Sequence, residues 1–284
     1  MSELPKRVLF ALVGAPLTIA LIYFGGWILA TALGVIAALG AWELYRMARE
    51  AGHEPMENAG IVLAASIPVM VHATYLGVFR VTVTVAALLF LALTAGVIWA
   101  RGTQRKPLVS LAITVTGVIY PALVTYMYPI RYHDYAIDAR AGTFLLMLPI
   151  ALTWATDTGA YFVGRSMGKH KLIPTVSPAK TVEGAVGGVA IAVLAAWLYV
   201  IFLLRPFAHL TMLPVGLTVF AIIVSCVGQT GDLAESLFKR DAGVKDSSRL
   251  LPGHGGILDR FDSLLFVLPV AYLLLSNLLL PAPG

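Results

Sequence analysis

Long apolar runs separated by short polar clusters dominate the chain. Each run of about 20 apolar residues is long enough to cross the hydrocarbon core of a bilayer as a helix. The predicted spans cover residues 7–25, 27–47, 59–78, 80–100, 108–130, 142–164, 182–204, 213–231 and 262–280. The pattern therefore predicts an all-α, polytopic integral membrane protein with about nine transmembrane helices.

The first two runs are the hardest to separate, because the chain carries no charge from Val8 to Trp42. Gly25-Gly26 is the turn signal between them, and it favours two helices. One long tilted helix is the alternative. Lys6-Arg7 before an apolar run is also found in secretory signals, but this run is too long for one, and we expect it to be retained.

The composition excludes an ordinary soluble domain, since 59% of the 284 residues are apolar and only 12% are charged, against about 25% charged in soluble domains. The single cysteine, Cys226, excludes an intramolecular disulfide and a cysteine-based metal site. No internal repeat or linker is evident. We expect one transmembrane domain over 1–284, with apolar N-terminal spans over about 1–140 and the chemistry over about 150–265.

The distribution of basic residues predicts the orientation, because short cytoplasmic loops hold an excess of Lys and Arg. With the N-terminus inside and nine spans, 16 of the 20 Lys and Arg residues fall inside. The 4 outside are Arg80, Arg131, Arg140 and Arg205. We therefore expect the last two inside loops, and with them the polar site, to face the cytoplasm, where the net charge of +5 meets anionic head groups and nucleotides.

Polar residues at membrane depth are costly and are therefore functional candidates. Asp232, Glu235, Ser236 and Lys239 have the i, i+3, i+4, i+7 spacing of one helix face, and Asp259 and Asp262 open the last predicted span. Carboxylates at two helix ends suit Mg²⁺ and the phosphates that it bridges. The alternatives are stabilisation of the helix dipole by Asp259 and Asp262, and an ion pair of Asp232 with Lys239 or Arg240.

The glycine-rich stretch from Pro252 to Gly256 precedes this last span. Glycines let backbone N–H groups approach an anion closely, and a following helix N-terminus favours negative charge. Several basic residues flank the stretch: Lys239, Arg240, Lys245, Arg249 and Arg260. Together they predict a cradle for several phosphates, in which His254 donates to a phosphate oxygen or, alternatively, bonds only to the loop backbone.

A second polar cluster lies upstream. Asp157 falls inside a predicted span, where it should face a polar cavity as a metal ligand or as the partner of a base. Ser177-Pro178 predicts an N-cap followed by a first-turn proline. This helix start would place Lys180 in the first turn, where a cation opposes the dipole unless it binds an anion. The alternative is that Lys180 extends to lipid phosphates.

These motifs resemble those of the phosphatidate cytidylyltransferases, also called CDP-diacylglycerol synthases. The match runs from Ser236 through Lys239-Arg240 and Lys245-Asp246 to L-P-G-H-G-G-I-L-D-R-F-D over 251–262. It extends upstream to D-T-G-A-Y over 157–161 and to the 177–184 segment. The Ser247-Ser248-Arg249 segment departs from the pattern at positions that we expect to vary.

The resemblance implies a nucleotidyltransferase that joins CTP to phosphatidic acid and releases pyrophosphate. It implies a Mg²⁺ cofactor with a second cation, and a bacterial inner membrane location. It leaves a homodimer open and implies no nucleic acid partner. The alternatives are a CTP-dependent lipid-alcohol kinase, which transfers the γ-phosphoryl group, and a cation-coupled transporter of a phosphorylated anion; a purely structural lipid-binding protein has less support.

The resemblance also implies roles for individual residues. The metal ligands would be Asp232 and Asp259, supported by Asp262. Asp157 and Lys239 would complete the catalytic set. The substrate-binding residues would be Ser177, Lys180, Ser236, Arg240, Lys245, His254, Gly255, Gly256 and Arg260.

Overall fold

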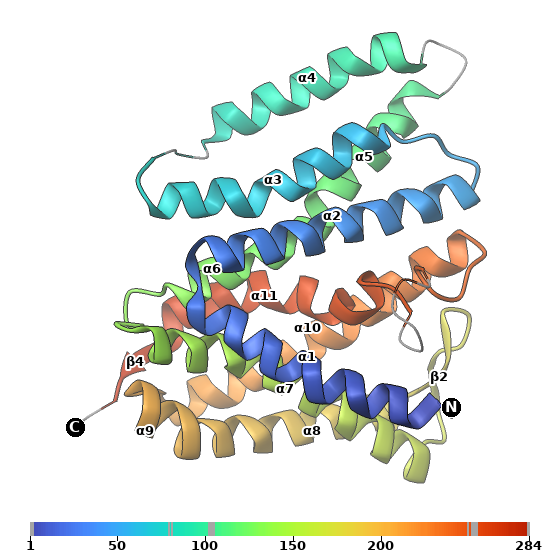
Figure 1. The fold of residues 1–284 in the computed structure, drawn as a ribbon. Helices are drawn as coiled ribbons and strands as arrows, with labels where there is room; N and C mark the ends of the chain where they lie inside the picture. Colours follow the sequence, from blue (N-terminus) through green and yellow to red (C-terminus); the bar gives the residue numbers. More distant parts are fainter. Residues whose placement is uncertain are drawn as a thin grey trace. The chain divides into compact units, whose positions relative to one another are not determined.

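The computed structural model describes residues 3–78, 80, 82–101, 106–248, 250 and 255–282, with the backbone alone over 3–13. Arg249 and His254 lie outside the described residues. The helices, shown in chain order in Figure 1, are α1 Glu3–Phe24, α2 Gly26–Glu50, α3 Glu57–Tyr75, α4 Val83–Arg101, α5 Pro107–Ala122, η1 Leu123–Tyr126, α6 Met127–Arg131, α7 Ala139–Met167, α8 Val182–Tyr199, η2 Val200–Leu204, α9 Arg205–Ala208, α10 Pro214–Asp241 and α11 Leu258–Leu278.

The prediction of an all-α membrane protein is confirmed. Within the described part of the chain, eight helical stretches are long and apolar enough to cross a membrane, from Gly26–Glu50 to Leu258–Leu278. The 22-residue helix α1 precedes them. The count of nine spans stays a prediction.

The first apolar region forms two helices and not one. The helix α1 ends at Phe24 and α2 begins at Gly26. Gly25 and Gly26 have φ angles of +60° and +52°, which residues with a Cβ atom rarely adopt. The glycine pair therefore ends the first helix, as the turn signal predicted.

The chain divides into two compact units. The first combines Met1–Phe10, Gly26–Thr125 and Phe238–Arg260. Here α2 packs against α3 and α5, and α4 packs against α5. Tyr45 of α2 is fully buried beside Gly60 and Gly117, and its hydroxyl donates to the Thr114 carbonyl over 2.7 Å. This close packing fixes α2, which carries one side chain of the candidate site.

The second unit combines Ala11–Gly25, Tyr126–Leu237 and Phe261–Gly284. Its main helix pair is α7 and α8, which meet along small residues. A Cβ atom at Gly187 would lie 2.5 Å from the Val163 side chain, and one at Gly188 would lie 2.9 Å from the Thr156 carbonyl oxygen. Small residues of this kind allow two membrane helices to approach closely.

Two short antiparallel strand pairs accompany the helices of this unit. The strands β1 Lys171–Ile173 and β2 Ser177–Thr181 form a hairpin directly before α8. The strands β3 Leu210–Met212 and β4 Leu279–Pro281 pair in register. Neither pair was predicted, because three to five residues are too few to give a recognisable alternation.

The predicted helix start at Ser177-Pro178 is wrong. Ser177 lies in β2 opposite Ile173, and α8 begins five residues later at Val182. Thr181 is the N-cap, and its hydroxyl accepts a hydrogen bond from the Gly184 N–H over 3.1 Å. Pairing with β1 keeps 177–181 extended, so Lys180 lies before the helix and not in its first turn.

Candidate functional site

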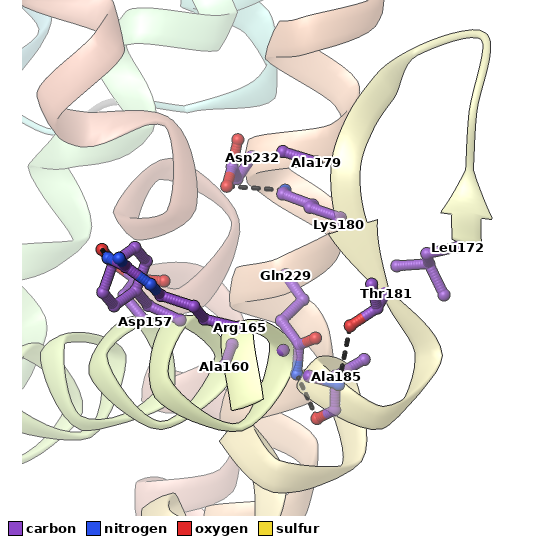
Figure 2. A pocket seen from close by; sticks show the side chains of 13 residues that line it. Asp157, Ala160, Arg165, Leu172, Ala179, Lys180, Thr181, Ala185, Gln229 and Asp232 are labelled. Atoms are coloured by element: carbon purple, nitrogen blue, oxygen red, sulfur yellow. Dashed lines mark hydrogen bonds and ion pairs between the residues drawn. The ribbon is translucent and has the colours of Figure 1, made fainter. Parts of the chain in front are cut away.

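The second unit contains a cavity of about 600 Å³ beside the β1–β2 hairpin. Its wall is built by α7, by the hairpin with the start of α8, and by the middle of α10 (Figure 2). The polar lining residues come from all three segments: Asp157, Tyr161, Arg165, Lys180, Thr181, Gln229 and Asp232. Three regions far apart in the sequence thus bring acids and bases to one cavity.

An ion pair crosses this cavity. Figure 2 shows the Lys180 side chain of β2 paired with Asp232 on α10. The ammonium lies 2.6 Å from a carboxylate oxygen, and the two side chains are 28% and 34% exposed. From the sequence, we expected Lys180 to bind an anionic group of a substrate, and Asp232 to pair with Lys239 or Arg240 if it held no metal. In the structure the two residues pair with each other.

The α7 wall holds Asp157, Tyr161 and Arg165, all of them exposed toward the cavity or solvent. Arg165 donates to the Tyr161 hydroxyl over 2.7 Å. On the opposite side, the Gln229 amide donates to the Ala185 carbonyl over 3.3 Å. Asp157 thus lies at the cavity that its sequence position predicted, although its role there stays a prediction.

A second polar cluster lies in the first unit and centres on Asp259, at the start of α11. One Asp259 carboxylate oxygen accepts from the Lys239 ammonium over 2.6 Å. The other accepts from the Ser247 N–H at 3.0 Å, the Ser247 hydroxyl at 2.9 Å and the Gly256 N–H at 2.8 Å. The Lys239 and Asp259 side chains are only 12% and 8% exposed. This is a buried ion pair.

The two described glycines of the glycine-rich stretch make room for this cluster. Gly255 has φ +77°, and a Cβ atom there would lie 2.6 Å from an Asp259 carboxylate oxygen. A Cβ atom at Gly256 would lie 2.1 Å from the Ser247 hydroxyl oxygen. The Gly256 N–H binds Asp259 in this structure, so the close approach that the sequence predicted is made to a carboxylate of the protein itself.

Sequence reasoning missed Glu43, a fully buried acid on α2. Its carboxylate accepts from the hydroxyls of Ser247 and Ser248 at 3.0 and 2.6 Å, and from the N–H groups of Ile257 and Leu258 at 2.8 and 2.7 Å. The available signal was an acidic residue inside the predicted span 27–47, where charge is costly.

The remaining predicted residues are more dispersed. The Ser236 hydroxyl lies 3.4 Å from a carboxylate oxygen of Asp232. Asp262 accepts from the N–H of Ser263 over 2.6 Å. Ser177 lies in the hairpin but does not line the cavity, and three basic residues of the first unit are exposed: Arg240, Lys245 and Arg260.

The donor set suits a hard cation only in part. No group of three histidine, cysteine, aspartate or glutamate side chains within the described residues is arranged to hold a metal ion. Asp232 and Asp259 are each paired with a lysine. Carboxylate oxygens nevertheless fit Mg²⁺, which usually takes one or two of them and completes its shell with water and substrate phosphates.

A helical membrane protein with carboxylates and bases gathered at polar sites is a candidate enzyme for phosphorylated lipids. Similarity to known proteins narrows this class. The chain belongs to the cytidylyltransferase family, whose model matches residues 5–278.

Several curated relatives share the name phosphatidate cytidylyltransferase. A phosphatidate cytidylyltransferase of Haemophilus influenzae is 34% identical over 286 aligned residues, covering 94% of this chain and 96% of that protein. Proteins of that name from Bacillus subtilis and Staphylococcus saprophyticus are 43% and 49% identical, over 58% and 51% of this chain and 57% and 54% of their own. The predicted family is thereby confirmed.

Proposed function

We infer that this membrane protein is a phosphatidate cytidylyltransferase, which transfers CMP from CTP to phosphatidic acid and releases pyrophosphate. Family membership over residues 5–278 and the relative that matches 94% of the chain support this activity. The observation within the molecule that carries it is the cavity where Asp157, Asp232, Lys180 and Arg165 meet, because phosphoryl chemistry needs both cation-holding acids and phosphate-binding bases.

The reaction places few demands on acid–base groups. An oxygen of the lipid phosphate attacks the α-phosphorus of CTP, and the bond from that phosphorus to the bridging α–β oxygen breaks. Pyrophosphate leaves with the electron pair. Because phosphate monoesters are largely ionised near pH 7, no side chain has to remove a proton from the nucleophile. The protein has to align the two phosphates and stabilise the developing charge.

Lys180 and Arg165 are the bases that we assign to substrate phosphates in the cavity. Lys180 is held near its place by Asp232 and has only to exchange one anionic partner for another. Arg165 is oriented by the Tyr161 hydroxyl, and its planar group can donate two parallel hydrogen bonds to a phosphate. These bases would offset the charge that accumulates on the leaving pyrophosphate.

Asp232 and Asp259 are our principal candidates for holding Mg²⁺, with Asp157 and Asp262 in support. When bound, the ion would neutralise phosphate charge and orient the phosphate oxygens. Each principal carboxylate is now neutralised by a lysine, so metal binding at either residue requires its lysine to turn to another anion. A triphosphate supplies that anion. We therefore propose that nucleotide and Mg²⁺ bind together.

The apolar helices support a membrane location, and the family supports nucleotide and lipid substrates. We propose in addition that the substrates are CTP and phosphatidic acid, that the membrane is a bacterial inner membrane, and that the site opens to the cytoplasm, which the basic-residue distribution favours. A homodimer remains a proposal, and light scattering on the purified protein in detergent would test it.

The deciding experiment follows both products. Purified protein receives phosphatidic acid, Mg²⁺ and CTP labelled either in the cytidine or in the γ-phosphate. We expect equal amounts of lipid-linked cytidine and pyrophosphate, and neither when Mg²⁺ is chelated. Label from the γ-phosphate on lipid, with free CDP, would instead identify the lipid kinase. Absence of both products, with uptake of a phosphorylated anion into vesicles, would identify the transporter.

A further inference from the structure

Glu43 has the features of a group that organises the site without facing a substrate. Its side chain is completely buried, and all four of its described hydrogen-bond donors come from 247–258 of the same unit. Two of them, the N–H groups of Ile257 and Leu258, stand at the N-terminus of α11. Such N–H groups have no partner within the helix, so the Glu43 carboxylate caps α11 from another helix.

The cap is connected directly to Asp259. The Ser247 hydroxyl oxygen lies 3.0 Å from a Glu43 carboxylate oxygen and 2.9 Å from an Asp259 carboxylate oxygen. A hydroxyl has one proton to donate, so it serves one carboxylate at a time. Any change in the charge around Asp259 is therefore felt at Ser247 and, through it, at Glu43.

We propose that Glu43 is a positioning residue of this enzyme, which fixes the geometry of Asp259 and Lys239 by capping α11 and by holding Ser247 between the two carboxylates. The proposal rests on the proposed function for its catalytic consequence. A small displacement of a phosphate- or metal-binding group is enough to reduce turnover strongly, and the fixed cap prevents that displacement when Asp259 exchanges partners.

Ser247 and Ser248 provide a matched pair of variants. Both serines are 1% exposed and both bond Glu43, but the described bonds of Ser248 do not reach Asp259. Ser247→Ala should lower kcat about 100-fold, with the KM values for CTP and phosphatidic acid changed less than about threefold. Ser248→Ala removes a similar bond to Glu43 and should retain kcat within about threefold.

Glu43→Gln should lower kcat as much as Ser247→Ala. The glutamine replaces one acceptor oxygen by an NH2 group, which cannot accept a hydrogen bond from the donors around it. The double variant Glu43→Gln/Ser247→Ala should be no slower than Glu43→Gln alone, since residues that act through one bond are not additive. Glu50→Gln, an exposed site on the same helix, is the control and should match the wild type.

Hydrogen exchange supplies a readout that does not depend on catalysis. In Glu43→Gln, amides of 255–259 should exchange at least about tenfold faster, while those of α7 and α8 keep their rates. Unchanged exchange at 255–259, or equal kinetic losses in Ser247→Ala and Ser248→Ala, would overturn the proposal. If the wild type makes no CDP-lipid, the proposed function fails, and the exchange comparison still decides the role of Glu43.

Discussion

The two principal carboxylates differ in their surroundings, and the same substitution should therefore have different effects. Asp232 is a third exposed and pairs across a cavity with Lys180, whereas Asp259 is 8% exposed, accepts from Lys239 and two backbone N–H groups, and shares the Ser247 hydroxyl with Glu43. A pair that is only partly buried, like Lys180 with Asp232, contributes about 1 kcal/mol to stability. Breaking a buried pair from one side costs about 3–5 kcal/mol.

Asp232→Asn should therefore separate activity from folding. We expect the melting temperature to stay within about 3 °C of the wild type, since little stability depends on this partly buried pair. Activity should fall by at least about 3 kcal/mol in the transition state, more than 100-fold, because the anion that holds the cation is lost. Thermal unfolding in detergent and steady-state assays measure both. Normal turnover at saturating Mg²⁺ would remove Asp232 from the site.

Asp259→Asn should instead affect both properties. The buried Lys239 ammonium would lose its charged partner, and we expect a loss of about 3 kcal/mol or more in unfolding free energy together with inactivity. The double variant Asp259→Asn/Lys239→Met should recover part of this stability while staying inactive. Equal melting temperatures for the wild type and the Asp259→Asn variant would contradict the buried ion pair.

Lys180→Gln tests whether Lys180 binds a substrate phosphate in addition to forming its ion pair with Asp232. If Lys180 binds a substrate phosphate, kcat/KM should fall about tenfold or more. If the pair with Asp232 is purely structural, its loss would cost about 1 kcal/mol of stability and leave the kinetics unchanged. Varying CTP and phosphatidic acid separately identifies the substrate concerned. Lys171→Gln, on the same hairpin but outside the cavity lining, is the control.

Individual chemical groups were easier to predict than their partners. The acids and bases of the motifs could be identified because charge is unusual in so apolar a chain. Their pairing could not, because Lys180 with Asp232 and Glu43 with Ser247 are brought together only by tertiary packing. Ser247 was expected to be a variable position, yet its hydroxyl bridges two carboxylates. One sequence contains no local signal for such a contact.

At the scale of elements, long periodic segments were predicted well and short ones were not. The continuation of the helix from the eighth predicted span through Lys239 is confirmed by α10, which runs to Asp241. The hairpin before α8 was mistaken for a helix start, since Ser-Pro fits an N-cap as well as it fits a strand. Strand pairing over five residues outweighed the local capping preference.

The α7–α8 contact gives a prediction for a whole element. Gly187→Ala should destabilise the protein, because the added methyl would lie 2.5 Å from the Val163 side chain, and overpacking costs about 1–3 kcal/mol. Gly96→Ala on α4 is the control, since its nearest neighbour would lie 3.8 Å away. There the higher helix propensity of alanine should leave stability unchanged or raise it. Melting temperatures that fall equally in both variants would contradict a close α7–α8 contact.

At the scale of the whole molecule, the excess of basic residues on one side predicts the topology. Cys226 is the sole cysteine and is exposed, so Cys226→Ala supplies a background for single labels. Cysteines at the exposed positions Ala179 and Asp246 should react with a membrane-impermeant maleimide from the cytoplasmic side, and one at Ile137 from the other side. Labelling of Ile137 and Asp246 from the same side would refute the odd number of crossings between them.

The carboxylate of Glu43 also bears on how the protein is made. Its hydroxyl and N–H donors lie more than 200 residues later in the chain, the nearest being 204 residues away. At roughly 5–20 residues per second, the ribosome needs about 10–40 s to reach them. During that interval α2 carries an acid without its final partners. Chains truncated before residue 247 should therefore be degraded by membrane proteases faster than the full-length chain.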